Sequence, residues 1–153
     1  MFHMKICIVA SAGGHLVQCL KLLPILKKHK IFVITFTASH LKKSLKGLKV
    51  YQIQNPRRNI KKYIKYLPLF FKILKNEKPR VVITTGAGVA VPVCFLSKFI
   101  FKSKLIFIES FSRIRRPSLT GRILYPIADL FIVQWRYLLK KYGDKVIYGG
   151  SLL

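Results

Sequence analysis

A turn of small residues, Ser11-Ala12-Gly13-Gly14-His15, directly follows the first apolar run of the sequence. Paired glycines let the backbone approach a ligand closely, and a helix that begins here offers free N–H groups and the positive end of its dipole. Ser11, Gly13 and Gly14 are therefore candidates for binding an anion such as phosphate. A tight strand-to-helix turn that needs glycine only for its geometry accounts for the same residues equally well.

His15 opens the helix that is expected after this turn. The positive end of a helix dipole lowers the pKa of an imidazole and keeps the ring neutral. A neutral imidazole can take a proton from a hydroxyl group, so His15 is a candidate general base. The alternative is a histidine that only forms a hydrogen bond at the start of the helix.

A second glycine turn, Thr84-Thr85-Gly86-Ala87-Gly88, follows another β-branched run. Thr85, Gly86 and Gly88 repeat the arrangement of the first turn and are candidates for binding the same anion. A purely structural turn is the alternative here too. Two such turns in one chain favour a shared crevice.

A third polar segment, Glu109-Ser110-Phe111-Ser112-Arg113, follows an apolar strand. Glu109 could take a proton from a hydroxyl group or hold a sugar hydroxyl, and its alternative role is a salt bridge to one of the many cations. Ser110, Arg113 and Arg116 are candidates for binding phosphates, since guanidinium groups clamp them through two hydrogen bonds. A solvated basic loop that also includes Arg115 is an equally simple account.

Common nucleotide and metal sites are absent from the sequence. No G-x-G-x-x-G fingerprint occurs, no acidic residue ends the second strand, and no G-K-[ST] follows the glycines. Cys7, Cys19 and Cys94 lie in apolar stretches without the spacing of metal ligands and are expected to be buried thiols. We therefore expect no NAD, no ATP and no bound metal or other cofactor.

The elements that must position these turns alternate between strand and helix. Strands are predicted over 5–10, 31–36, 49–53, 80–84, 104–108, 130–133 and 145–147. Helices are predicted over 16–28 with a restart at Pro24, 39–45, 59–76 with Asn59 as cap and a kink at Pro68, 89–100, 118–127 and 136–142. This alternation predicts one Rossmann-like α/β domain over 1–153, with a parallel sheet and helices on both faces. Ligands bind at the carboxyl ends of such strands, where the three turns lie.

The helix predicted over 59–76 separates apolar from basic residues. Its apolar arc is expected to pack on the sheet, as in an ordinary surface helix, and consists of Tyr63, Ile64, Leu67, Phe70, Phe71 and Leu74. Tyr66 and Leu69 flank that arc and extend it, and lysines occupy the opposite side. The alternative is a helix that rests on anionic lipid through Lys61, Lys65, Tyr66, Leu69 and Lys72.

Positive charge dominates the chain, with 29 Lys and Arg against 4 Asp and Glu and a formal net charge of +25. Such a field attracts nucleic acid, anionic lipid headgroups or pyrophosphate-bearing substrates, although a lysine-rich proteome would account for part of the excess. Helix-turn-helix, RNP and KH signatures are absent, so nucleic acid is not expected as a partner. No apolar run reaches the roughly 18 residues of a membrane span, and the first residues lack a signal-peptide pattern. We expect a cytoplasmic protein that could lie on the membrane surface.

Three segments resemble a known family: KICIVASAGGHLVQCLKLLPILKKHKIFVIT, ITTGAGVAVP and FIESFSRIRRPSLTGRILYPIADLFIVQW. They are similar to the oligosaccharide-biosynthesis family of short GT-B glycosyltransferase halves. This family includes the acceptor-side subunit of the eukaryotic transferase that adds the second GlcNAc to dolichyl-pyrophosphate-GlcNAc. It also includes bacterial subunits of capsular and exopolysaccharide glycosyltransferases. The N-terminal half of the GlcNAc transferase that makes lipid II is a more distant likeness.

The resemblance implies an acceptor-side, N-terminal half of a GT-B enzyme. A separately encoded subunit would bind a UDP-sugar, and the sugar would pass to a polyprenyl-pyrophosphate-linked sugar in the cleft between the two, at the cytoplasmic face of the membrane. Basic residues and helix dipoles would stabilise the departing UDP without a metal. The residues that match the family motifs are Gly13, Gly14, His15, Gly86, Gly88, Glu109 and Arg113. Eukaryotic members carry an N-terminal membrane anchor that this sequence lacks, and the basic helix is the candidate replacement. A non-catalytic anchor for the partner subunit is the alternative function.

Overall fold

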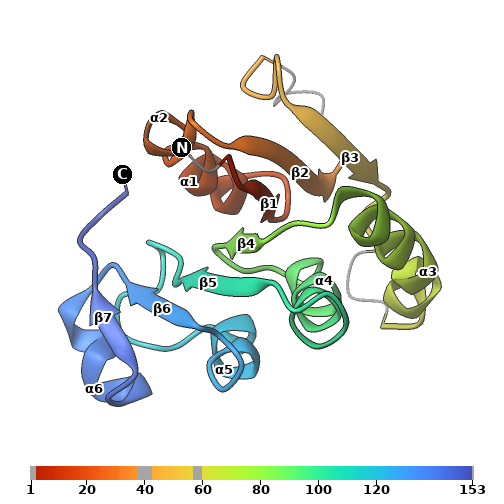
Figure 1. Cartoon of the computed structure of the whole chain (residues 1–153). Helices are drawn as coiled ribbons and strands as arrows, with labels where there is room; N and C mark the ends of the chain where they lie inside the picture. Colours follow the sequence, from red (N-terminus) through yellow and green to blue (C-terminus); the bar gives the residue numbers. More distant parts are fainter. Residues whose placement is uncertain (1–2, 38–42, 57–59, 153) are drawn as a thin grey trace.

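The strands form one parallel sheet. The structure, a computed structural model, describes residues 3–37, 43–56 and 60–152, and only the backbone of 60–62. The strands are β1 (Lys5–Val9), β2 (Lys30–Phe36), β3 (Lys49–Ile53), β4 (Val81–Thr84), β5 (Lys104–Ile108), β6 (Leu130–Val133) and β7 (Val146–Tyr148). They lie in the order β3-β2-β1-β4-β5-β6-β7 (Figure 1). At the centre, Ile8 of β1 is in register with Val33 of β2 and Ile83 of β4. This is the Rossmann-like parallel sheet that the sequence predicts.

Short helices connect most of the strands. They are α1 (Gly14–Leu20), α2 (Leu23–Leu26), α3 (Ile60–Glu77), α4 (Ala90–Phe95), the π-helical segment η2 (Leu96–Ile100), α5 (Leu119–Leu124), η3 (Arg136–Leu138) and α6 (Leu139–Tyr142). α1 and α2 lie on one face of the sheet and α3, α4 and α5 on the other (Figure 1). Both faces therefore carry helices, as predicted for parallel strands with crossover connections.

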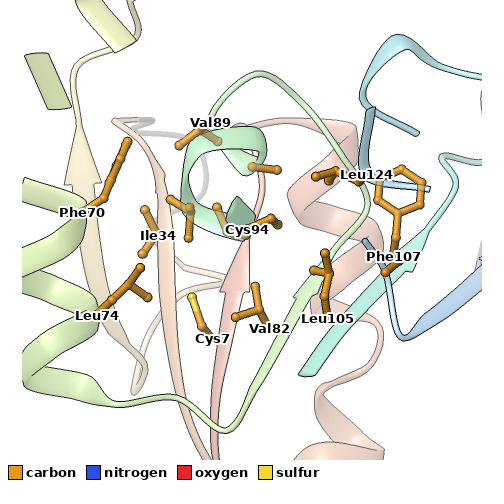
Figure 2. Packing of buried hydrophobic residues seen from close by; sticks show 14 of the residues in the cluster. Cys7, Ile34, Phe70, Leu74, Val82, Val89, Cys94, Leu105, Phe107 and Leu124 are labelled. Atoms are coloured by element: carbon orange, nitrogen blue, oxygen red, sulfur yellow. The ribbon is translucent and has the colours of Figure 1, made fainter. Parts of the chain in front are cut away.

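The larger core lies between the sheet and the α3–α5 layer. Phe70 and Leu74 of α3 pack with Ile34 of β2, and Leu124 of α5 lies near Phe107 of β5 (Figure 2). These side chains are at most 1% exposed. Burying each of them contributes about 1.5–3 kcal/mol relative to exposure, so this layer holds the α3–α5 segments on the sheet.

The opposite face is covered less completely by helices. α1 and α2 pack over β1 and β2 around Leu16 and Cys19. Over β1, β4 and β5 the small cluster of Ile6, Ile83 and Ile108 is contacted by the α1–α2 segment and by Leu152 of the C-terminal tail. The tail turns back toward the α1–α2 side of the sheet (Figure 1).

Several predicted helices have different bounds in the structure. The helix predicted over 16–28 spans α1 and α2, which together end at Leu26, and the predicted restart at Pro24 is confirmed, since this residue lies at the start of α2. Residues 43–47 form turns rather than the predicted helix, while 39–42 and the predicted cap Asn59 lie outside the described residues. Pro68 lies inside α3, whose 18 residues are continuous.

The predicted apolar arc of α3 is only partly correct. Phe70 and Leu74 are buried as expected, but Ile64 is 58% and Phe71 39% exposed. Ile64 and Phe71 are seven residues apart and follow the same edge of the helix, beside the side that packs on the sheet. α3 therefore packs on the core through Phe70 and Leu74, while Ile64 and Phe71 form a second apolar strip that is exposed.

Candidate functional site

The first two glycine turns follow β1 and β4, the two central strands from which the sheet extends in opposite directions. β1 and β4 are neighbours, and the sheet grows from β1 to β2 and β3 and from β4 to β5, β6 and β7. Ligands of open α/β sheets bind at the carboxyl ends of strands at such a switch point. Ser11, half-buried, leads from β1 to α1, whose first residue is Gly14. Gly13 has a φ of 119°, a conformation that favours glycine.

His15 connects the two turns. Its Nδ1 lies 2.9 Å from the carbonyl oxygen of Thr85, and the Thr85 hydroxyl donates to the His15 carbonyl oxygen at 2.8 Å. A carbonyl only accepts hydrogen bonds, so Nδ1 carries the ring proton and Nε2 keeps its lone pair. Burial lowers the pKa of His15 below its usual 6.5, although the bond to Thr85 opposes this change. His15 is therefore neutral at pH 7, with Nε2 free to accept a proton.

The second turn holds His15 in position, and two of its possible donors to an anion already form hydrogen bonds within the protein. Thr85 is fully buried, and the Gly86 N–H donates to the Thr84 hydroxyl at 2.9 Å. A Cβ on Gly86, whose φ is 109°, would lie 3.5 Å from the His15 ring. A Cβ on Gly88 would collide with the hydroxyl of Tyr63 in α3. The Thr85 hydroxyl and the Gly86 N–H thus both have hydrogen-bond partners within the protein, and the predicted anion-binding role of this turn stays a prediction.

Glu109, at the end of β5, is completely buried. Its Oε1 accepts from the Ser110 N–H at 2.9 Å, and its Oε2 accepts from the Ser118 N–H and hydroxyl, both at 3.0 Å. The Tyr142 hydroxyl also donates to Oε2. Within the described residues no cation pairs with this carboxylate, so neither an accessible base nor a surface salt bridge describes it. Glu109 therefore does not fit its predicted role as the group that deprotonates the acceptor, because four donors surround it and solvent does not reach it.

The Glu109 carboxylate accepts hydrogen bonds from both ends of the basic loop, which comprises residues 111–117. Ser110 precedes the loop, and Ser118 follows it and caps α5 by accepting from the Gly121 N–H at 2.9 Å. A Cβ on Gly121 would lie 2.6 Å from Glu109 Oε2 and would collide with the Tyr142 hydroxyl. Burial, with the bond to Glu109, raises the pKa of Tyr142 well above its usual range, so this phenol remains a donor.

The loop itself presents its arginines to solvent. Arg113, Arg115 and Arg116 are exposed and, with Ser112 and Ile114, line an open hollow of about 460 Å³. The charge of Arg113 reaches His15, where it contributes to lowering the pKa of the ring. These positions fit the predicted anion-binding role of Arg113 and Arg116.

Ser110 is the exception among the predicted loop residues. It is 3% exposed, and its hydroxyl lies 3.1 Å from the Ser112 hydroxyl and 3.4 Å from the Gln18 amide nitrogen. Its side chain is therefore part of the buried support of the loop, and its predicted contact with a phosphate does not fit.

Two buried glutamines, which sequence reasoning missed, hold the start of this loop. Gln134 follows β6 and donates to the Gln18 side-chain oxygen at 2.8 Å and to the Glu109 carbonyl at 3.0 Å. Gln18 in turn accepts from the Phe111 N–H at 2.9 Å. Trp135, the residue after Gln134, donates its indole N–H to the Phe111 carbonyl at 2.7 Å. The position of Gln134 at a strand end was the only sequence signal for it.

A family model decides the relationship of this chain to known proteins. Residues 58–152 match the model described as oligosaccharide biosynthesis protein Alg14 like. The chain belongs to this family. The family predicted from the three sequence segments is thus confirmed, including the segments that hold Gly86, Gly88, Glu109 and Arg113.

Individual relatives carry the same family name. The human protein named UDP-N-acetylglucosamine transferase subunit ALG14 is 27% identical, over 95% of this chain and 82% of its own length. The protein of that name from Candida albicans is 39% identical, over 48% of this chain and 36% of its own length. That of Schizosaccharomyces pombe is 43% identical, over 42% of this chain and 32% of its own length.

Solved structures show the same fold. Acinetobacter baumannii MurG superimposes with a TM-score of 0.79 at 17% identity, over 97% of this chain and 46% of its own. UDP-GlcNAc 2-epimerase from Neisseria meningitidis, solved with UDP-GlcNAc, gives 0.72 at 17% identity, over 97% and 47%. The chain thus spans about half the length of these structures and has the fold of a Rossmann-like half of a GT-B enzyme, as predicted.

The predicted membrane-contact residues of this Alg14-like chain are only partly exposed. Lys65, Leu69 and Lys72 are exposed on α3. Tyr66 is half-buried, and its ring packs against Phe70 at 6.1 Å between centroids. The side chain of Lys61 lies outside the described residues. In the part of the chain that the structure describes, no helix is long and apolar enough to cross a bilayer, and no cluster of at least three metal-binding side chains occurs.

Proposed function

We propose that this chain is the acceptor-binding half of a two-subunit glycosyltransferase, which moves a sugar from a UDP-sugar to a polyprenyl-pyrophosphate-linked sugar. UDP-GlcNAc is the first candidate donor, because the relatives are named subunits of a UDP-N-acetylglucosamine transferase. A surface polysaccharide such as a capsule or exopolysaccharide is the expected destination of the product.

The observation that carries this proposal is the state of His15. The Thr85 carbonyl fixes the proton on Nδ1, and burial keeps the ring neutral, which leaves Nε2 as an acceptor at the carboxyl edge of the sheet. In the proposed step an acceptor hydroxyl attacks the anomeric carbon of the donor sugar, and the bond from that carbon to UDP breaks. The hydroxyl proton passes to His15 Nε2, and UDP leaves with the bonding electron pair.

The basic loop supplies the second part of the proposed site. The acceptor carries a pyrophosphate, and Arg113 and Arg116 are exposed in a hollow that opens beside the β5 end of the sheet. Guanidinium groups form paired hydrogen bonds with phosphate oxygens, so these residues would hold the acceptor while His15 acts on its hydroxyl. No metal is required, because cationic side chains and helix dipoles can stabilise departing UDP.

The proposed partner is a separately encoded subunit that binds the donor. This chain covers 46% of the MurG chain that it resembles, which corresponds to one of the two halves of a GT-B enzyme. The word subunit in the names of its relatives supports that arrangement. The proposed location is the cytoplasmic face of the membrane, where a polyprenyl-linked acceptor is accessible.

Co-expression with the proposed donor-binding subunit, followed by transfer from UDP-GlcNAc to polyprenyl-pyrophosphate-GlcNAc, tests this proposal. We expect the pair to be active and His15→Ala to lower kcat by about 100-fold or more. His29→Ala, at a half-buried histidine between α2 and β2, is the matched control and should leave the rate unchanged. Activity of the partner alone equal to that of the pair would favour the alternative, a non-catalytic anchor.

A further inference from the structure

Among the side chains that the structure describes, six large apolar ones are exposed on α3, α4 and η2. Leu69 of α3, at 40%, lies on a different side of the helix from Ile64 and Phe71, and the other five are taken as one set. They are Ile64 at 58% and Phe71 at 39% on α3, and Phe95 at 38%, Phe99 at 53% and Ile100 at 52% on α4 and η2. We name this set the α3–η2 patch. Soluble surfaces rarely gather so many aromatic and branched side chains unless something binds there.

One ring contact joins α3 to the residue after η2, and a second lies within the α4–η2 segment. The Phe71 ring of α3 lies 5.3 Å from the ring of Phe101, which directly follows η2. Phe95 and Phe99 lie 5.7 Å apart, one helical turn from each other. α3 and α4 lie side by side (Figure 1). The patch is therefore a surface shared by two elements and not a set of isolated residues.

Cations border the α3–η2 patch on two sides. Lys65, Lys72 and Lys75 are exposed along α3. At the other end Ile100 and Phe101 line a hollow of about 480 Å³ together with four cations, Lys78, Arg80, Lys102 and Lys104. Ile100 thus belongs both to the apolar patch and to a basic hollow, so the two surfaces are continuous.

The acidic residues do not add negative charge next to the α3–η2 patch, because each is paired with cations, buried or distant. The sequence has four acidic residues, all of them in the described part of the chain. Glu77 binds Lys5 and Lys49, Glu109 is buried, and Asp129 binds Lys98 and Lys104. Asp144 lies in the turn before β7, at the opposite end of the sheet from α3 (Figure 1).

We propose that the α3–η2 patch docks this chain on an anionic lipid bilayer. The five apolar side chains enter the interfacial region, while the α3 lysines and the basic hollow contact headgroup phosphates. Aromatic side chains favour that depth of the membrane, and each nearby cation adds attraction to anionic lipid. This inference rests on the membrane association in the proposed function and deepens it by assigning the surface. The surface keeps Lys65 and Lys72 from the sequence prediction, but its apolar part is the α3–η2 patch instead of Tyr66 and Leu69.

One end of the patch leads to the candidate site. Tyr63, in the first turns of α3, has its hydroxyl directly over Gly88 of the second glycine turn. Ile64 of the patch is the next residue. A polyprenyl chain held in the bilayer under the patch therefore has a short path by which its pyrophosphate can reach the carboxyl edge of the sheet.

Vesicle co-sedimentation of the whole chain tests this inference. We use phosphatidylcholine vesicles with and without phosphatidylglycerol, and expect binding that depends on the anionic lipid. Phe95→Ser with Phe99→Ser should lower partitioning by about tenfold or more, because buried aromatic area is lost. The triple change of Lys65, Lys72 and Lys75 to Gln should lower it by a similar factor through lost charge.

Matched controls are available on the other face of the sheet. Ile25→Ser removes a 75% exposed side chain from α2, and changes of Lys21, Lys27 and Lys28 to Gln remove three exposed cations. Both should bind vesicles like wild type. Thermal unfolding checks that all variants are folded. As a second measurement, Phe99→Trp should add fluorescence that brominated lipids quench, beyond that of the native Trp135.

Four outcomes would overturn the inference. They are no binding to anionic vesicles, equal losses in patch and control variants, no additional quenching in Phe99→Trp, and patch variants that keep vesicle binding but lose the partner subunit. The last would make the patch a protein interface. Vesicle binding needs neither the sugar donor nor the partner subunit. A co-expressed pair of subunits without transferase activity would therefore contradict the proposed function but would not affect this inference.

Discussion

The hydroxyl of Tyr142 donates a hydrogen bond to the buried carboxylate of Glu109, 33 residues earlier in the chain. α6, which ends at Tyr142, thereby supports the loop that carries Arg113 and Arg116. The same carboxylate oxygen accepts from Ser118 at the other end of this loop. The acid that stands out in the sequence thus holds the loop in shape and is not exposed to a substrate.

Removing the phenolic hydroxyl tests that role. Tyr142→Phe should lower the free energy of unfolding by about 1.5–3 kcal/mol, because a charged acceptor loses a buried donor. Glu109→Gln should cost at least as much, since its NH₂ group cannot accept from all of the donors around it. Urea unfolding measures both changes. Tyr137→Phe, at a 53% exposed tyrosine, is the control and should be neutral.

The kinetics of the proposed transferase can distinguish a supporting role of Glu109 from a catalytic role. With a supporting role, Glu109→Gln and Tyr142→Phe should both raise the KM for the acceptor, by a similar factor, through a displaced loop. A loss of kcat confined to Glu109→Gln, without loss of stability, would restore Glu109 as a catalytic residue.

Gly121 lies so close to Glu109 and Tyr142 that any side chain must displace them. Gly121→Ala should destabilise the chain by about 2 kcal/mol or more, the range for overpacking a filled site. Gly14→Ala is the matched change, because no atom lies within 4 Å of its added Cβ. It should be neutral or slightly stabilising, since alanine favours a helix more than glycine does. Equal effects of the two changes in urea unfolding would contradict the close packing at Gly121.

The pH dependence of the proposed transferase should follow His15. Its pKa is lowered by burial from 6.5, so the base is neutral above pH 6.5 and the rate should be level there. Protonation of Nε2 should reduce kcat only below 6.5, on an acidic limb that His15→Ala removes. An acidic limb at or above 6.5, or one that persists in His15→Ala, would assign the base to another residue.

Arg113 and Arg116 should act on acceptor affinity. Changing either to Gln should raise the KM for the pyrophosphate-linked acceptor about tenfold with little change in kcat, since a charge-assisted pair of hydrogen bonds is lost. The Arg122→Gln control changes an exposed arginine of α5 outside the loop and should leave the KM unaltered. A loss confined to kcat would contradict a binding role for the loop arginines.

The central strands were predictable because β-branched runs such as those of β1 and β2 are buried on both faces of the sheet. β3, β5 and β6 have the predicted bounds, β1, β2 and β4 differ by one residue at one end, and β7 is shifted by one residue. The environment of Glu109 was not predictable, because Ser118 and Tyr142 reach it only after α5 and α6 have packed. The exposed position of Phe71 was missed for a similar reason. The spacing of residues along a helix gives the angles between their side chains. It does not tell how much of the helix surface the sheet covers.

Glu77 gives a prediction about acid stability. Burial alone would raise its pKa, but hydrogen bonds from Lys49, Tyr51 and Lys5 outweigh this and lower it to about 2. Because the unfolded value is 4.5, the stabilisation is complete above pH 4.5 and is lost as the pH falls towards about 2. Glu77→Gln should therefore destabilise the chain by about 1–2 kcal/mol at pH 7, a figure reduced for the exposure of the lysines. The difference from wild type should shrink steadily below pH 4.5 in urea unfolding, and a constant difference down to pH 2 would contradict this ion-pair account of Glu77.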